Sequence, residues 1–426
     1  MSSSPSVFPL TPLSELLSNV VDNRGRTCPT AQEGIPLIAT NCITNHSIFP
    51  VFSKVRYVSQ ETYDTWFRQH PLPGDIVLVN KGSPGNVALV PDPVTFCFAQ
   101  DMVAIRPIES IDNFFLFAAL KSAQVRAQVE NIQVGTTIPH FKKSDFDKLL
   151  IPVPPLPAQK AIGLLHYRLG LKVETNRRIS ENLESIAQTL FRSWFVDFDP
   201  VRAKMAGEKP AGMDDATAEL FPDSMEESEL GEIPAGWKVG DLGELCHLTM
   251  GQSPPGDAYN LSGEGLPFYQ GRTDFGMRFP KTRMYSTLGN RKASPGDVLV
   301  SVRAPVGDLN QALEECVIGR GVAAVIHRSG SQAYSYSLMQ SIQHRLEYFN
   351  GEGTVFGAIN KTDFSSIPLV EPPVELLNRF DELASPVNGL LRSLHEQSQN
   401  LAATRDALLP RLISGELEVP EDLLVS

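Results

Sequence analysis

Short apolar runs alternate with Gly, Pro and Asn turns through two long parts of the chain, residues 1–150 and 233–368. Runs of four or five apolar residues between turn signals predict buried strands. The clearest runs are residues 76–79, 87–90, 298–302 and 322–326. Helical patterns near residues 114–129 and 335–348 accompany them. The pattern therefore predicts a mixed α/β (α+β) fold in each part rather than an all-β one.

Two further stretches, residues 151–198 and 369–416, repeat apolar residues at the seven-residue period of a coiled coil. Each begins after a proline-rich segment, and proline is tolerated in the first turn of a helix. Forty helical residues would reach about 60 Å, which is longer than a small domain, so we expect the helices to pair antiparallel. The predicted seam holds Ile162, Leu169, Asn176, Leu183 and Leu190 in the first helix and Phe380, Val387, Leu394, Leu401 and Leu408 in the second. The partner heptad position of the first helix, three residues after each seam residue, forms a second predicted column. It would hold Leu165, Lys172, Ile179, Ile186 and Ser193.

The two halves of the chain repeat each other in order. Pro73-Gly74-Asp75 precedes one apolar run and Pro295-Gly296-Asp297 another, at an offset of 222 residues. Lys143-Ser144-Asp145-Phe146 returns as Lys361-Thr362-Asp363-Phe364 at an offset of 218, and both copies then reach a Pro-Pro pair. A single P-G-D turn before an apolar run is frequent in unrelated proteins, but several matches in the same order indicate an internal repeat. The sequence therefore predicts a pseudo-two-fold molecule.

We expect six segments. They are a first α/β domain (1–150), a central long helix (151–198), an acidic linker (199–232), a second α/β domain (233–368), a C-terminal long helix (369–416) and a tail (417–426). The segment 199–232 is polar and acidic, and this composition predicts a flexible linker.

The net charge of −12 argues at first against a nucleic-acid partner, but its distribution changes that conclusion. Residues 201–232 carry −6 and residues 374–426 carry −5, whereas residues 1–150 and 233–373 each carry −1. Either large domain could thus have a basic face. The five cysteines are scattered and no long apolar run occurs, so we expect a cytoplasmic protein without a membrane partner.

No signature of catalysis was found. The chain lacks a G-x-x-x-x-G-K-[ST] loop, a G-x-S-x-G elbow and an H-E-x-x-H pair, so we expect no catalytic, cofactor-binding or metal-binding residues. Basic and amide side chains in the turn-rich parts are the candidates for contacts with phosphates and base edges. They are Asn41, Lys81, Lys142, Lys143, Arg272, Lys281, Arg283, Arg291, Lys292, Arg303 and Lys361.

The whole arrangement resembles the specificity subunits of type I restriction-modification systems. The resemblance rests on the duplicated order of several pieces. They are the Ile233-Pro234-Ala235-Gly236-Trp237 opening, the strand starts Ile35-Pro36-Leu37-Ile38 and Pro295-Gly296-Asp297-Val298-Leu299, the I-P-x-P-P-x-x-x-Q junction ending at Gln159, and the repeated long helices, which end in Leu409-Pro410-Arg411-Leu412-Ile413-Ser414-Gly415-Glu416-Leu417. The N-terminus before Leu13 lacks the Ile-Pro-x-Gly-Trp opening.

The resemblance implies a non-catalytic subunit that reads a split, asymmetric sequence of double-stranded DNA, with the paired helices setting the gap between the halves. It also implies two methylation subunits and two restriction subunits as partners, with S-adenosylmethionine, ATP and magnesium bound by those partners. Two other interpretations stay open: a coiled-coil scaffold with protein-binding heads, and a freestanding DNA methyltransferase or nuclease.

Overall fold

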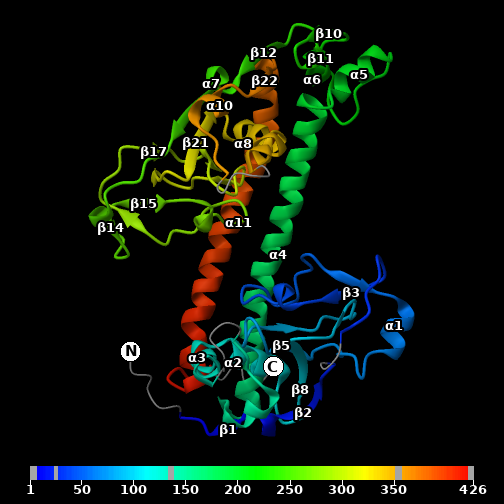
Figure 1. Cartoon of the computed structure of the whole chain (residues 1–426), viewed down its shortest axis with the longest axis vertical. Coiled ribbons are helices and arrows are strands. Elements are labelled where there is room, and N and C mark those ends of the chain that lie inside the picture. Colours follow the sequence, from blue (N-terminus) through cyan, green and yellow to red (C-terminus); the bar gives the residue numbers. More distant parts are fainter. Residues whose placement is uncertain (1–6, 24–26, 133–138, 351–356, 421–426) are drawn as a thin grey trace. The chain divides into compact units, whose positions relative to one another are not determined.

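A computed structural model describes residues 7–23, 27–132, 139–350 and 357–420 of the chain. Two compact units divide it: unit 1 comprises residues 1–178 and 396–426, and unit 2 comprises residues 179–395. The two long helices, α4 (Leu156–Phe195) and α11 (Val374–Ser414), each contribute one part to unit 1 and the other to unit 2. Figure 1 labels these helices and the strands around them.

Each unit contains the same antiparallel four-stranded sheet. In unit 1 the strand order is β2-β8-β5-β6, with bounds Leu17–Val21, Met102–Pro107, Ile76–Val79 and Val87–Leu89. In unit 2 it is β13-β21-β18-β19, with bounds Cys246–Met250, Val322–His327, Val298–Ser301 and Leu309–Gln311. All four strands predicted from apolar runs are present and buried. Because equivalent strands occupy equivalent places, the internal repeat extends from sequence to fold.

A second sheet, with three strands in unit 1 and five in unit 2, shares a common core in both units. Unit 1 has β4 (Arg56–Val58), β3 (Ile35–Ile38) and β7 (Cys97–Phe98) in that order. Unit 2 has β14 (Tyr259–Asn260), β16 (Tyr285–Ser286), β15 (Leu266–Tyr269), β20 (Cys316–Ile318) and β17 (Lys292–Ala293). The β3–β7 and β15–β20 pairs are parallel, and the other pairs in these sheets are antiparallel. Strand β15 therefore corresponds to β3.

Helices cover one face of each four-stranded sheet. Helix α2 (Asn113–Lys121) contacts β6 and β8, and α8 (Gln332–Ser341) contacts β21, β18 and β19 (Figure 1). Each is followed by a second helix, α3 (Ala123–Ile132) or α9 (Gln343–Glu347). The predicted single helices near 114–129 and 335–348 are thus each broken in two. Short pairs of strands, β1–β9 (Leu10–Pro12 and Leu150–Pro152) and β12–β22 (Lys238–Asp241 and Pro368–Glu371), complete the two domains.

The remaining elements are short. The α-helices among them are α1 (Gln60–Thr65), α5 (Asp199–Met205), α6 (Asp215–Glu219), α7 (Leu242–Leu245) and α10 (Lys361–Ser365). The 3₁₀ helices are η1 (Leu13–Leu16), η2 (Thr40–Cys42), η3 (Lys143–Lys148), η4 (Gly256–Ala258), η5 (Arg272–Asp274) and η6 (Tyr348–Asn350). Strands β10 (Met225–Ser228) and β11 (Gly231–Pro234) form a hairpin.

The repeated P-G-D turn leads into the central strand of each four-stranded sheet. Gly74 has a φ of 84° and Gly296 a φ of 93°, which is a region that glycine adopts without a steric penalty. The following carboxylates accept from the backbone three residues earlier, Asp75 from Leu72 N at 2.8 Å and Asp297 from Ser294 N at 2.7 Å. The motif is therefore structural in both copies.

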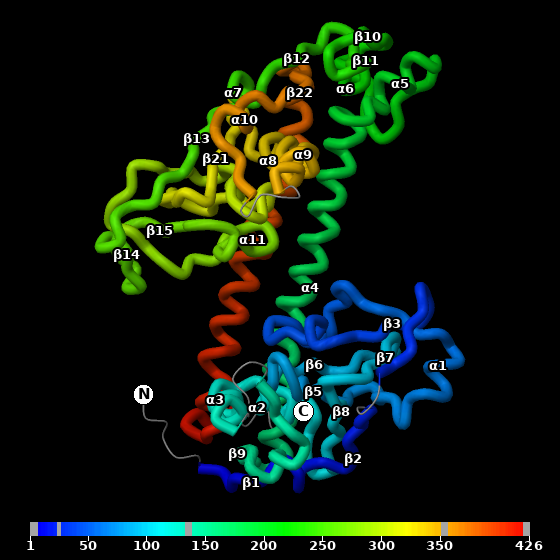
Figure 2. Tube along the Cα trace, viewed as in Figure 1, coloured from blue at the N-terminus to red at the C-terminus, as the bar shows by residue number. Residues whose placement is uncertain are grey.

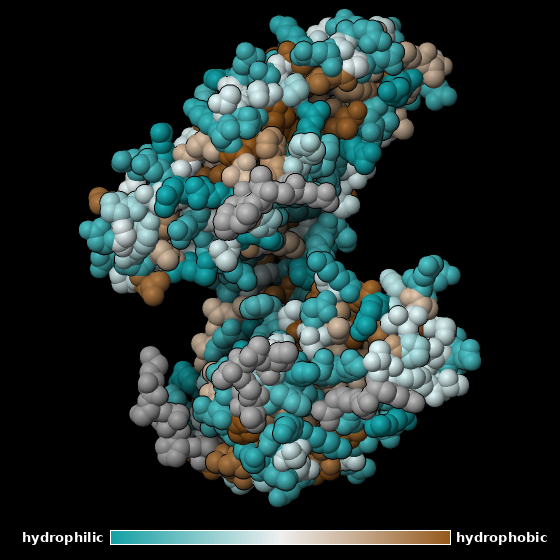
Figure 3. Space-filling view, viewed as in Figure 1, coloured by the Kyte–Doolittle hydropathy of each residue, from teal (hydrophilic) through white to brown (hydrophobic). Residues whose placement is uncertain are grey.

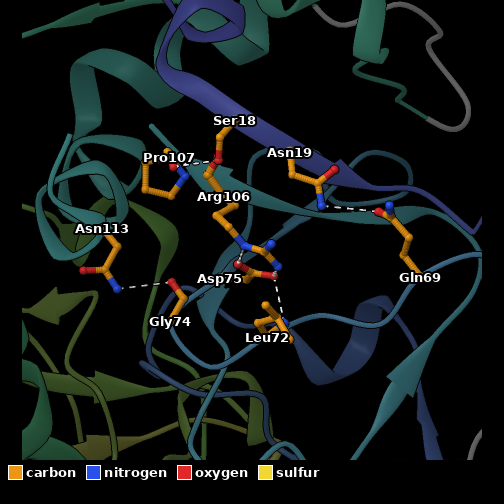
Figure 4. A network of polar contacts seen from close by, with 9 residues as sticks. All are labelled: Ser18, Asn19, Gln69, Leu72, Gly74, Asp75, Arg106, Pro107 and Asn113. Carbon is orange, nitrogen blue, oxygen red and sulfur yellow. Dashed lines mark hydrogen bonds and ion pairs between the residues drawn. The ribbon is translucent and has the colours of Figure 1, made fainter. Parts of the chain in front are cut away.

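The two copies differ in the partner of this carboxylate. Asp75 is 2% exposed and receives two parallel hydrogen bonds from Arg106 on β8, at 2.7 and 2.8 Å (Figure 4). This fork geometry is the strongest form of an ion pair. Among the described residues Asp297 has no such arginine, and burial raises its pKa while the hydrogen bond from Ser294 N opposes that shift. Unit 1 thus neutralises its buried turn carboxylate with arginine, whereas the half-buried Asp297 of unit 2 has no arginine partner among the described residues.

Helices α4 and α11 run antiparallel within each unit. In unit 1, Ile162 belongs to the same core as Leu409, Leu412 and Ile413, and Figure 2 traces the end of α11 beside the start of α4. In unit 2, Phe191 lies 5.7 Å from Phe380 between ring centroids. None of the ten predicted seam residues is exposed. Asn176 is 1% exposed and donates to Gln397 Oε1 at 2.8 Å and Ser398 Oγ at 3.2 Å within unit 1.

The predicted second column of the first helix is wrong. Ile179 and Ile186 are 37% and 61% exposed, and Lys172 is exposed as well. The inward column instead holds Ser180 and Trp194, which are 5% and 2% exposed. It lies four residues after the seam column rather than three. The sequence predicted that Ile179 and Ile186 face inward because they are apolar. It does not reveal which side of the helix the domain covers, and that side decides which residues are buried.

The prediction of a flexible acidic segment over residues 199–232 is also wrong. This segment forms α5, α6 and most of the β10–β11 hairpin. Val201 and Phe221 are buried in the core of unit 2 beside the aromatic end of α4. Asp214, which caps α6, pairs with Arg379 of α11 at 2.7 Å. A few apolar side chains among many charged ones are sufficient to order the segment, because they join a core built by other elements.

Candidate nucleic-acid interface

Three connections meet at one end of the β-structure in each unit, and we call their surface the turn face. In unit 1 it comprises residues 39–45 after β3, residues 80–86 between β5 and β6, and residues 139–143. In unit 2 it comprises residues 270–283 after β15, residues 302–308 between β18 and β19, and residues 357–361. Each connection follows the equivalent element in both units, so the turn face is itself duplicated.

Hydrogen bonds join the three connections of unit 1. Asn86 Nδ2 donates to Ile43 O at 3.1 Å, which links the first connection to the second. Gly82 N donates to Pro139 O at 3.1 Å and Phe141 N to Asn80 O at 2.8 Å, which links the second to the third. This pairing places the backbone of Lys81 opposite His140. Lys81 and Lys142 are therefore close along one surface.

Unit 2 repeats the arrangement with other side chains. Arg272 Nε lies 2.6 Å from Asp308 Oδ2, which links the first connection to the second. Ala304 N donates to Gly357 O at 2.8 Å and Ile359 N to Val302 O at 3.1 Å, which links the second to the third. The backbone of Arg303 here pairs with Ala358, as Lys81 pairs with His140 in unit 1. Lys81 and Arg303 thus occupy corresponding positions, as do Asn41 and Arg272 after β3 and β15.

The turn face is basic in a chain that is acidic overall. In unit 1 its three connections contain three lysines, four asparagines and no Asp or Glu. In unit 2 they contain six Lys or Arg residues against two Asp residues. Both of these carboxylates are held by arginine, Asp274 by Arg283 and Asp308 by Arg272. Such a surface attracts phosphates, and its amides and arginines can bond to base edges.

All eleven residues predicted to contact DNA are exposed. Nine lie on the turn face, namely Asn41, Lys81, Lys142, Lys143, Arg272, Lys281, Arg283, Arg303 and Lys361. Arg291 and Lys292 do not, since they lie at β17, the end strand of its sheet, where Lys292 pairs with Glu315 at 3.1 Å. Lys81, Lys142 and Lys143 form no ion pair with another described residue. Their charges therefore face solvent.

Sequence reasoning missed two residues of this region. His140 is placed opposite Lys81 only by long-range backbone pairing. Arg278 lies within the cluster of cations at 277–283, but its side chain is 7% exposed, so it points away from the turn face. Burial cannot be read from a run of charged residues, and no local signal distinguished Arg278 from Arg272 or Arg283.

The described residues offer little reactive chemistry. All five cysteines are buried, and burial raises the pKa of the Cys97, Cys246 and Cys316 thiols to about 12. These thiols stay protonated at neutral pH and are poor nucleophiles. In the part of the chain that the structure describes, no group of three His, Cys, Asp or Glu side chains is placed to hold a metal ion.

The surface in view mixes hydrophilic and hydrophobic side chains (Figure 3). Among the described helices, none combines the length and the apolar character that crossing a membrane requires.

Comparison with known proteins places these features in a family. Residues 13–185 match the model described as the type I restriction modification DNA specificity domain. The MjaX and MjaIX type I restriction enzyme specificity subunits of Methanocaldococcus jannaschii are 26% and 24% identical over 401 and 405 residues, covering 91% of this chain and 88% of each relative. The HindI specificity subunit of Haemophilus influenzae is 26% identical over 353 residues, covering 71% of this chain and 77% of the relative.

A solved structure shares the fold. The type I restriction-modification S subunit of M. genitalium aligns over 97% of both chains with a TM-score of 0.54 and 15% sequence identity. The family match covers the first copy of the repeat, and the second copy has the same strand order. The first copy of the repeat thus matches a DNA specificity domain, and the second copy repeats its fold. Over most of its length the chain is similar to type I restriction enzyme specificity subunits, and residues 13–185 match the DNA specificity domain of that family.

Proposed function

We propose that this chain recognises a split DNA sequence, with the turn face of each unit reading one half. DNA recognition is the role of the family, and catalysis belongs to the methylation and restriction subunits with which its members assemble. The observation that carries the split target is the duplicated turn face, in which corresponding loops present different side chains. Different side chains read different bases, so the two halves of the target differ.

The boundaries of the two recognition domains are part of this proposal. We assign one half of the target to residues 1–150 and the other to residues 233–368. The match to the specificity domain and the repeat of the β3 and β15 connections support the assignment. The location would be cytoplasmic, since the DNA partner of such a system is the genome of the cell.

Substituting the corresponding residues Lys81→Ala and Arg303→Ala tests the proposal. Each side chain is exposed at the same place in its unit, so each variant removes one cation from one half-site. We expect each to weaken binding of the full target about tenfold at physiological salt, because one phosphate or base contact is lost. Fluorescence titration with oligonucleotides altered in one half or the other, with methylation subunits present, measures the effect.

The result expected is a reciprocal one. In the Lys81→Ala variant, changing bases in one half of the target should lower the binding affinity less than it does in wild type. In the Arg303→Ala variant, the same should hold for the other half. Lys238→Ala provides the control, because Lys238 is an exposed cation on β12, away from the turn face. Wild-type affinity in both variants would contradict the placement of the interface. A wild-type complex that binds all DNA sequences equally would contradict recognition itself and favour a scaffold that binds only protein.

We further propose that two methylation and two restriction subunits complete the complex, and that S-adenosylmethionine, ATP and magnesium bind to them. The duplication supports this stoichiometry, since two similar units offer two similar docking sites. Native mass spectrometry of the assembled complex should give one copy of this chain with two copies of each partner. Ultraviolet cross-linking of labelled S-adenosylmethionine should label the methylation subunit, and label on this chain would contradict the assignment.

A further inference from the structure

One cation of the second turn face is buried rather than exposed. Arg278 lies in the connection after β15, between Arg272 on one side and Lys281 and Arg283 on the other. Its side chain is 7% exposed, whereas those of the other three face solvent. Removing a guanidinium from water is unfavourable unless it is paired and hydrogen-bonded. The groups that contact the Arg278 guanidinium therefore show which elements its burial holds together.

Four elements of unit 2 surround the Arg278 guanidinium. Nη2 donates to Asn388 Oδ1 on α11 at 2.7 Å, and Nε and Nη2 donate to Gln311 Oε1 on β19 at 3.3 and 3.2 Å. Nη1 lies 3.7 Å from Glu184 Oε1 on α4. The guanidinium carbon lies 3.3 Å from the centroid of the Tyr336 ring on α8. One side chain thus ties the loop to both long helices, the sheet and the helix that covers it.

Unit 1 has a different residue at the corresponding position. Gln311 N donates to Arg278 O at 2.9 Å, and Leu89 N donates to Ile48 O at 2.8 Å. Gln311 and Leu89 are the last residues of the equivalent strands β19 and β6, where they pair with Val298 and Ile76. Ile48 therefore corresponds to Arg278.

Ile48 also contacts a long helix, but through an apolar contact. It is 3% exposed, and a Cβ added to Gly170 of α4 would lie 2.9 Å from its Cδ1 atom. Glycine at this position leaves the space that the isoleucine fills. In unit 1 the chain three residues beyond the first connection is thus fastened to α4 by packing. In unit 2 the first connection itself is fastened to α4 and α11 by a buried polar cluster.

We propose that Arg278 and Ile48 are positioning residues that clamp the base-reading loops of the two domains to the spacer helices. The inference rests on the proposed function, because it concerns how the turn face is held for reading DNA. Neither residue reaches the DNA. Each acts through the exposed neighbours on its loop, Arg272, Lys281 and Arg283 in unit 2 and Asn41 in unit 1. Each clamp serves only its own half of the target.

Substitutions at the two clamps should therefore have separable effects. Arg278→Met keeps the bulk of the side chain but removes its charge and all three hydrogen-bond contacts. Binding of the full target should weaken about tenfold, and discrimination against altered bases should fall only in the half that Arg303→Ala identifies. Ile48→Ala should lower discrimination only in the half that Lys81→Ala identifies. Arg278→Lys should resemble Arg278→Met, because an ammonium cannot span Asn388 and Gln311 with a planar fork.

Hydrogen exchange of the full chain without DNA gives a readout independent of recognition. Arg278→Met should speed exchange of the amides at 270–283 severalfold and leave those at 39–52 unchanged, and Ile48→Ala should do the reverse. Asn388→Ala is a milder variant that keeps the charge pair with Glu184, so it serves if Arg278→Met fails to fold. It should give the same pattern with a smaller amplitude.

Three outcomes decide the matter. Unchanged exchange at 270–283 in both Arg278→Met and Asn388→Ala would overturn the clamp. Equal loss of discrimination in both halves would also overturn it, because that result reflects general destabilisation. A wild-type complex without sequence discrimination would overturn the proposed function instead, while the exchange measurement would still report on the clamp.

Discussion

Insertion of one heptad into both α4 and α11 is expected to lengthen the gap of the DNA target by about three base pairs. Seven helical residues add about 10 Å, and base pairs of B-DNA are spaced about 3.4 Å apart. The two half-sequences should stay the same, because no residue of either turn face changes. The insertions belong between residues 178 and 179 and between residues 395 and 396, where the division between the two compact units falls along each helix.

Sequencing of methylated adenines in cells carrying the altered system gives both the half-sequences and the gap. An insertion of five residues in each helix is the matched control. Seven residues return the inward face of a helix almost to its starting direction, but five turn it by about 140°. The control should lose target methylation. An altered half-sequence, or a gap unchanged after the heptad insertions, would contradict the role of the helices as a spacer.

The unfolding free energy of unit 1 is expected to rise by about 2 kcal/mol between pH 7 and pH 8.5 through Lys121 alone. Lys121 lies at the end of α2, where Nζ donates to Ser47 O at 2.7 Å and lies 4.9 Å from the Phe117 ring centroid. Burial lowers the pKa of Lys121 to about 7, and the charge of Arg405 contributes to the shift. Above pH 7 the folded chain sheds this proton.

The sign follows from proton binding. An unfolded lysine keeps its proton to about pH 10, so between pH 7 and pH 10 the unfolded state binds more protons, and stability increases with pH. The raised pKa values of Cys97, Cys246 and Cys316 act in the opposite direction above about pH 8.5, which sets the upper limit of the window. Below pH 7 the Lys121 contribution levels off.

Urea unfolding of wild type and Lys121→Met over this pH range isolates the effect. Methionine keeps the length and bulk of the side chain but cannot bind a proton. The variant should be more stable than wild type at pH 7, and the difference should shrink as the pH rises to 8.5. Parallel pH profiles for the two proteins would show that Lys121 does not titrate in this window.

Much of the candidate interface was predictable because it lies in loops tied to a repeated motif. Lys81 and Arg303 follow the two P-G-D turns at the same spacing, so the order of residues along the chain is enough to show that they correspond. Turn signals place such residues at the ends of strands, where side chains reach solvent. The meeting of the three connections was not predictable, since it depends on pairing between Lys81 and His140 and between Arg303 and Ala358, which are far apart in the chain.

Local pattern alone determined four buried strands, the two long helices and the duplication of the chain. A strand such as Ile76–Val79 can be predicted because all its residues are apolar. A helix of 40 residues can be predicted because its apolar residues keep the same heptad spacing along its length. Only the tertiary structure decided which way each side chain points. Ser180 faces inward while Ile186 faces solvent, Phe221 orders an acidic segment, and Arg278 is buried among three exposed cations. The physical reason is that burial is conferred by residues distant in the chain, and hydrophobicity along a single segment does not encode which distant surface will cover it.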